Sequence, residues 1–138
     1  MMKNLFKISL FAFGLVLFTA CSDDDGPTAS ITVVEETNGD TGGDFTGNGG
    51  TATRTFVWQN SQTTAEYNAD ITATATGVFN MILLDAEGTE VLNRSLGETA
   101  EPDSFSGVTV AGVAGEWTVT ITVTNFSGDG SYSLSAGN

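Results

Sequence analysis

The sequence predicts an all-β protein, an antiparallel β-sandwich with a jelly-roll-like arrangement of about seven strands. Two observations support this prediction. Apolar and polar residues alternate with a period of two from residue 51 onward, and turns containing glycine separate the alternating runs. No window shows a convincing helical period. The short spacing of the runs is typical of a sandwich. We expect strands near residues 54–59, 66–76, 78–85, 90–96, 105–111, 116–125 and 131–136.

The clearest expected strand covers residues 116–124. Its large apolar side chains all fall on one face and its four threonines on the other. The apolar members are Trp117, Val119, Ile121 and Val123. This alternation indicates a strand with one buried and one solvated face. Residues 71–76 repeat the pattern with smaller side chains, whereas residues 78–84 are apolar on both faces, as expected of a central strand.

Turns are expected where glycines interrupt the alternation. Residues 85–89 form a tight hairpin in this interpretation, because Gly88 can adopt a positive φ. Residues 112–115 and 127–130 separate strands in the same manner. The folded part then covers residues 51–138, about 88 residues, which is enough for one domain and too little for two.

Residues 1–20 have the layout of a secretory signal peptide. Lys3 and Lys7 supply a basic start, residues 8–18 are apolar, and the small residues Thr19 and Ala20 follow. A transmembrane helix fits less well. At 1.5 Å per residue, residues 8–20 would span about 20 Å, against a hydrocarbon core of about 30 Å.

Cys21 is the only cysteine and directly follows this signal. The segment FTAC resembles a bacterial lipobox, and the resemblance implies that Cys21 carries diacylglycerol and palmitate chains that anchor the protein stably in a membrane. The next residues resemble the export signal of Bacteroidetes-type surface lipoproteins, which implies display on the outer face of the outer membrane. They are Ser22, Asp23, Asp24 and Asp25. The alternative is a solvated charge run that opens a linker.

Residues 21–50 are expected to be a flexible, acidic and glycine-rich tether. Residues 37–50 contain six glycines in fourteen positions, a composition typical of flexible linkers. As a coil, residues 22–50 would span about 30 Å. Residues 31–36 interrupt the polar sequence, either as a short strand on the edge of the domain or as an apolar patch in a coil, and both interpretations stay open.

The charge balance excludes one class of partner. The chain has 17 acidic and 4 basic residues and a net charge of −13. Removal of residues 1–20 takes away Lys3, Lys7 and no acid, so the mature chain carries −15. A surface this acidic repels phosphate backbones, so we expect no nucleic-acid binding.

Part of the chain also has a family resemblance. Residues 79–88, 115–121 and 130–134 resemble the bacterial pre-peptidase C-terminal type of β-sandwich and its jelly-roll relatives. The resemblance implies a non-catalytic module of a secreted or surface protein. The acidic signature common in that family is absent here, where Asn80, Met81, Ile82 and Leu83 stand in its place.

The sequence lacks the residues that most catalytic mechanisms need. The chain has no histidine and the mature chain no lysine, so serine or cysteine nucleophiles, Schiff bases and zinc sites lose their usual groups. We therefore expect no enzyme, with a carboxylate-based hydrolase as a distant alternative. No cofactor is expected; the alternative is calcium, with four acidic residues in loops as candidate ligands. These are Asp85, Glu87, Asp103 and Asp129.

The expected function is non-covalent. Tyr67 and Phe126 lie off the clear apolar stripes and are the candidates for stacking on a sugar. We expect a lipid-anchored binding or accessory module of the outer envelope that engages a glycan or a protein, and the alternative is a structural lipoprotein without a tight ligand. An exposed aromatic pair would favour a glycan, and an unprotected edge strand would favour a protein.

Overall fold

The structure is a computed structural model that describes residues 26–97 and 103–137. The signal peptide of residues 1–20, Cys21 and the acidic run of residues 22–25 lie outside the described residues. The described chain forms eight β-strands and no helix, which confirms the all-β prediction. The strands are β1 (Ala29–Ile31), β2 (Val34–Glu35), β3 (Thr41–Asn60), β4 (Ala65–Ile71), β5 (Thr76–Leu84), β6 (Glu90–Gly97), β7 (Ser104–Val108) and β8 (Gly115–Ala136).

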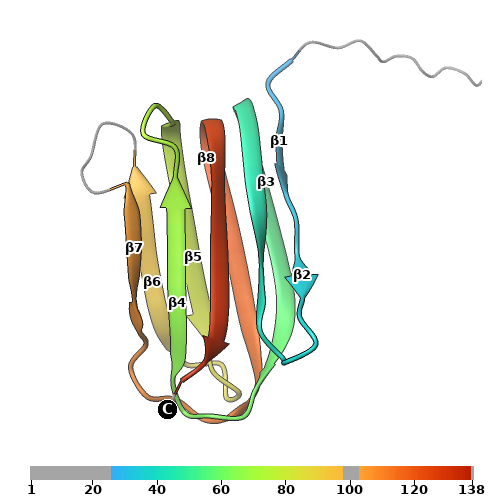
Figure 1. The fold of residues 1–138 in the computed structure, drawn as a ribbon, viewed down its shortest axis with the longest axis vertical. Coiled ribbons are helices and arrows are strands. Elements are labelled where there is room, and N and C mark those ends of the chain that lie inside the picture. The colour runs from blue at the N-terminus through green and yellow to red at the C-terminus, as the bar shows by residue number, and fades with distance from the viewer. Residues whose placement is uncertain (1–25, 98–102, 138) are drawn as a thin grey trace, which may run out of the picture.

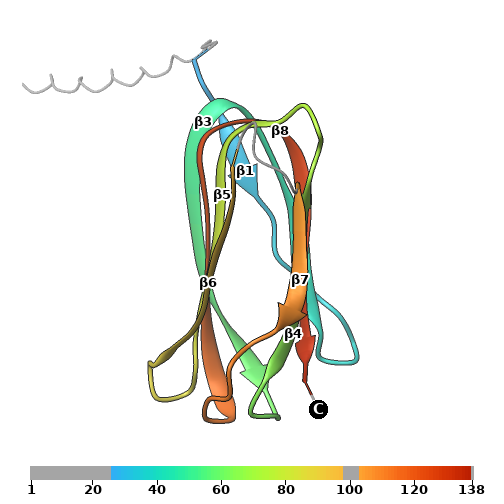
Figure 2. The ribbon, with the colours of Figure 1, turned by 90° about the vertical axis from the view of Figure 1, so that its left-hand side faces the viewer.

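Two long strands, β3 and β8, create both layers of the sandwich. They pair antiparallel along most of their length, and both arch over the same end of the molecule, so that each contributes one half to each layer (Figure 2). Residues 41–48 pair with residues 127–134 in one layer, and residues 52–60 pair with residues 115–123 in the other. The fold is therefore a single bent sheet whose two halves face each other.

Each layer has a simple antiparallel order. In the layer that we call the β4 layer, the order is β7, β4, the second half of β8, the first half of β3, and then β1 and β2 (Figure 1). In the β5 layer, the order is β6, β5, the first half of β8 and the second half of β3. Among the described strands, the second half of β3 is therefore an edge of this layer.

Irregular backbone at the bend reverses which residues face inward. Gly49 has φ of 88° and Asn125 has φ of 48°, and the pairing register of β3 with β8 shifts on both sides of Gly50. Such shifts mark β-bulges, which bend a strand and re-aim its side chains. In β8 the inward residues are odd-numbered up to Val123 and even-numbered from Phe126 onward.

The core lies between the two layers and is rich in aromatic rings. Phe45 of β3 stacks on Phe79 of β5 with 4.4 Å between ring centroids, and Phe126 meets Phe45 edge-on at 5.4 Å. Trp58 and Trp117 contact each other edge-on at 6.1 Å at the opposite end. The described core residues run from Ile31 to Leu134, so residues 22–138 contain all of them.

The expectation of a flexible tether is wrong for residues 41–50, which form the first half of β3. Thr41 and Phe45 are 2% and 1% exposed, and glycines occupy positions where other backbone comes close. A Cβ on Gly43 would lie 2.0 Å from the carbonyl oxygen of Thr32. These glycines serve close approach of strands. Residues 31–36 belong to the domain, since β1 and β2 pair with β3.

Other expected boundaries also need correction. Residues 72–75 form a turn between β4 and β5, with the Ala75 amide donating to the Thr72 carbonyl at 2.9 Å, although their alternation predicts a strand. Residues 127–130 continue β8 through the bend and do not end it. The hairpin at residues 85–89 is confirmed, with the Asp85 amide donating to the Thr89 carbonyl at 2.8 Å and Gly88 at φ of 84°.

Candidate functional site

The two aromatic residues expected at the surface are buried. Phe126 is 0% exposed and Tyr67 is 8% exposed, so neither can stack on a sugar in this conformation. Tyr67 faces inward from β4 and meets Phe105 edge-on at 5.7 Å. Among the residues described, no aromatic side chain is a large exposed hydrophobic group; the exposed ones are all valines. The prediction of an aromatic platform at Tyr67 and Phe126 is therefore wrong.

Asp85, expected as a calcium ligand, has a structural role. Its side chain accepts three backbone amide hydrogen bonds of 2.9 Å, at Oδ1 from Glu87 and Thr89 and at Oδ2 from Val113. The bonds from Thr89 and Val113 hold the pKa of the Asp85 carboxyl below its usual value. The side chain thereby ties the β5–β6 turn to the loop before β8.

The other acidic candidates do not converge with Asp85. Glu87 is exposed in the β5–β6 turn, whereas Asp129 lies just past the bend of β8, opposite Thr46 of β3. Asp129 accepts a 2.7 Å hydrogen bond from the Thr46 hydroxyl, and the Asp103 carbonyl accepts from the Ile71 amide at 2.9 Å. Within residues 26–97 and 103–137, no three His, Cys, Asp or Glu residues are grouped to hold a metal.

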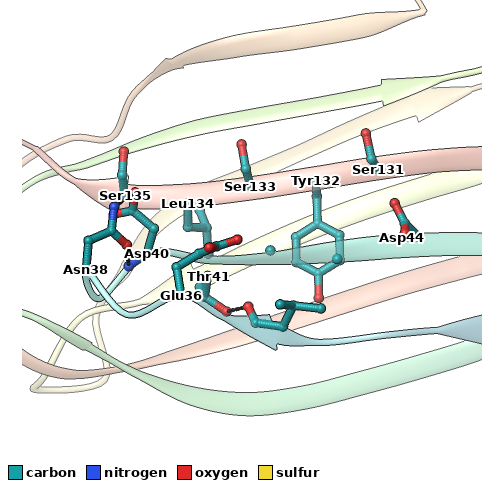
Figure 3. A pocket seen from close by; sticks show the side chains of 13 residues that line it. Glu36, Asn38, Asp40, Thr41, Asp44, Ser131, Tyr132, Ser133, Leu134 and Ser135 are labelled. Atoms are coloured by element: carbon teal, nitrogen blue, oxygen red, sulfur yellow. Dashed lines mark hydrogen bonds between the residues drawn. The ribbon is translucent and has the colours of Figure 1, made fainter.

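A groove of about 520 Å³ crosses the outer face of the β4 layer (Figure 3). Its floor is β3 at Gly42, which lies opposite Val34 of β2 and opposite Ser133 of β8. Because adjacent strands are about 4.8 Å apart, β2 and β8 stand about 9.6 Å apart across this floor. The glycine leaves a trough about one extended chain wide.

The groove is polar and negatively charged. Ser131, Ser133 and Ser135 project from β8 on the same side, and Asp44 projects beside them from β3 (Figure 3). Three further polar side chains come from the β2–β3 turn: Glu36, Asn38 and Asp40. None of the described residues that line the groove is cationic, so it suits a neutral or cationic ligand.

The serine row separates this groove from a second one. The neighbouring groove, of about 350 Å³, is lined by Ser133 and Ser135 on one side and by Glu66, Asn68 and Val108 on the other. Together the two grooves make the outer face of the β4 layer a hydroxyl and carboxylate surface. It resembles a polar binding face more than the apolar pocket that most small-molecule sites require.

The two arginines of the chain close the lateral openings of the sandwich. Arg94 faces inward from β6, places its guanidinium carbon 4.7 Å from the centre of the Phe105 ring, and donates to the Tyr67 hydroxyl at 3.2 Å. On the other side, Arg54 of β3 donates to the Ile31 carbonyl at 2.9 Å.

The second half of β3 forms an open edge of the β5 layer. Residues 52–60 pair with β8 on one side and, in the described part of the chain, with no strand on the other. Val57 is 53% exposed, and Thr53 and Thr55 are exposed beside it. These β-branched side chains favour strand pairing. The segment carries Arg54 and no carboxylate, although the whole chain has a net charge of −13.

The sequence pattern alone did not identify either surface. The groove exists because Gly42 lies between Val34 and Ser133. It could be predicted only if residues 41–50 were expected to form a strand. The alternation of Thr41, Gly43 and Phe45 was a usable signal, since inward positions recur every second residue. The free edge depends on strand order, which no local pattern contains.

Comparisons with protein-family models, with curated proteins and with solved structures each return no match. No helix among the described residues is long and apolar enough to cross a membrane.

Proposed function

We propose that this protein is a lipid-anchored, cell-surface module of the outer envelope, without catalytic activity, that binds a protein partner by strand addition. The observation that carries the proposal is the open edge of β3 at residues 52–60. An exposed edge offers unpaired backbone donors and acceptors, and an extended segment of another chain can satisfy them. The burial of Tyr67 and Phe126 removes the stacking groups that would favour a sugar.

The anchoring part of the proposal rests on the sequence. Cys21 follows a signal-like segment, and Ser22 with the three aspartates resembles a surface export signal. The residues needed for most covalent catalysis are absent from the mature chain, which supports a non-catalytic role. The unmatched thiol of an exported protein is accounted for if it carries the lipid.

Two measurements on intact cells test the proposal. Metabolic labelling with a palmitate analogue is expected to mark the wild type and not Cys21→Ser, and added protease is expected to digest the domain before lysis. A photo-reactive amino acid at position 57 is expected to form a covalent adduct, with position 108 as the control. Val57 and Val108 are 53% and 58% exposed, so accessibility alone would label both. Digestion only after lysis, or no adduct from position 57, would contradict the proposal.

A glycan ligand is the second candidate, and the hydroxyl-lined groove over Gly42 favours it. Its test is calorimetric titration with neutral oligosaccharides, using Ser133→Val as the groove variant and Ser106→Val as a variant that leaves this groove intact. A neutral oligosaccharide that binds the wild type and Ser106→Val, but not Ser133→Val, would favour the glycan over the protein partner.

A further inference from the structure

The open edge of β3 is a long edge strand of this acidic chain that contains no carboxylate of its own. At −13, two copies repel each other, and association is confined to surfaces with few carboxylates. Residues 52–60 contain none, whereas the edge strand β6 carries Glu90 and β2 carries Glu35. The edge strand β7 also lacks carboxylates, but it is only 5 residues long.

We propose that two copies pair antiparallel through residues 52–60, with Phe56 on the two-fold axis. This inference rests on the proposed function, because it names the partner of the same edge. A two-fold contact is self-complementary, and two strands related by it are antiparallel. The β5 layers of the two copies then join into one continuous sheet.

The faces allow this register, and the charges favour it over an axis at Arg54. In a continuous sheet, residues opposite each other point to the same face, so an outward residue must meet an outward residue. With Phe56 on the axis, Thr55 lies opposite Val57 of the partner, and Arg54 lies opposite the partner's Trp58. An axis at Arg54 would place the two guanidinium groups opposite each other, which is unfavourable.

Carboxylates beside Trp58 favour this register. A groove of about 280 Å³ next to Trp58 is lined by Glu35, Glu36 and Glu116, together with Val57 and Gln59. The pairing brings Arg54 of each copy to the side of this groove on the other copy. The only basic residue of the edge therefore meets the acidic groups nearest to it, twice per pair.

Sedimentation equilibrium of residues 22–138 tests the pairing. The wild type is expected to form a concentration-dependent dimer. The double variant Thr55→Lys/Val57→Lys, or Thr55→Glu/Val57→Glu, places like charges opposite each other, and each is expected to raise the dimer Kd at least tenfold. An equal mixture of the two variants is expected to restore dimers, because the opposed charges then attract. The control Ser106→Lys/Val108→Lys, on the outer face of β7, is expected to dimerise like the wild type.

Three results would overturn the inference. The first is a wild type that stays monomeric up to about 1 mM, the order of concentration that tethering gives. The second is charged variants that dimerise as well as the wild type, and the third is a mixture that fails to restore dimers. The cellular adduct at position 57 separates this inference from the proposed function. An adduct with a different protein, from a chain that is monomeric in solution, overturns self-pairing and leaves the proposed function standing.

Discussion

Replacing Phe45 with alanine tests whether residues 41–50 belong to the core. Phe45 is 1% exposed, stacks on Phe79 at 4.4 Å and meets Phe126 at 5.4 Å. Loss of a buried phenylalanine with its cavity costs about 3–5 kcal/mol. Since small domains have about 5–15 kcal/mol of total stability, Phe45→Ala is expected to remove a large share of it.

The measurement is urea unfolding of residues 22–138, followed by tryptophan fluorescence. Phe45→Leu, which keeps most of the volume, should cost clearly less than Phe45→Ala and remains measurable if the alanine variant is unfolded. Asn48→Ala is the matched control, because Asn48 is exposed on the same strand and such a change usually stays within about 0.5 kcal/mol. If Phe45→Ala costs no more than this control, the segment is not packed as described and the reasoning fails.

Three further predictions concern stability. Gly43→Ala should destabilise by about 1–3 kcal/mol, since its Cβ would meet the Thr32 carbonyl oxygen at 2.0 Å, whereas Gly97→Ala, with nothing within 4 Å, should be near neutral in the same urea assay. The Asp85 carboxyl has a lowered pKa, so its contribution to folding stability is present above the unfolded pKa of about 3.9 and is lost as the pH falls through the folded pKa. Asp85→Asn should therefore remove this part of the acid dependence of the melting temperature. Burial raises the pKa of Tyr132 to about 12, so stability should fall as the pH rises from about 10 to about 12, and Tyr132→Phe should remove this loss. An unchanged pH profile in either variant would contradict the assigned group.

The sequence was most informative where the alternation was uninterrupted. Trp117, Val119, Ile121 and Val123 face inward as their period predicts, and Gly88 lies in the hairpin turn that its position suggests. The prediction for Tyr67 overlooked a similar pattern: Ala65, Tyr67 and Ala69 alternate with polar residues, and the structure has the Tyr67 ring in the core.

Bulges and close backbone contacts explain the parts of the fold that the sequence did not predict. Phe126 faces inward only because the backbone changes phase around Asn125, where φ is 48°, and a period of two gives no warning of such a change. In residues 41–50, glycine composition is typical of a linker, but here it permits contact with the backbone of Thr32 and Phe126. Whether glycine gives freedom or close approach depends on neighbours distant in sequence.

The sandwich begins close to Cys21 in the sequence, and this limits how it can be oriented on a membrane. Only residues 22–28 separate Cys21 from β1, and eight residue steps reach at most about 28 Å. The nine residues of the β3 edge alone extend about 30 Å. If Cys21 is lipidated, the sandwich stays close to the bilayer, because the segment that links it to the anchor is no longer than the sandwich itself. Two copies that pair antiparallel and are anchored in the same leaflet would then have to lie along the membrane surface, with both anchors beneath the pair.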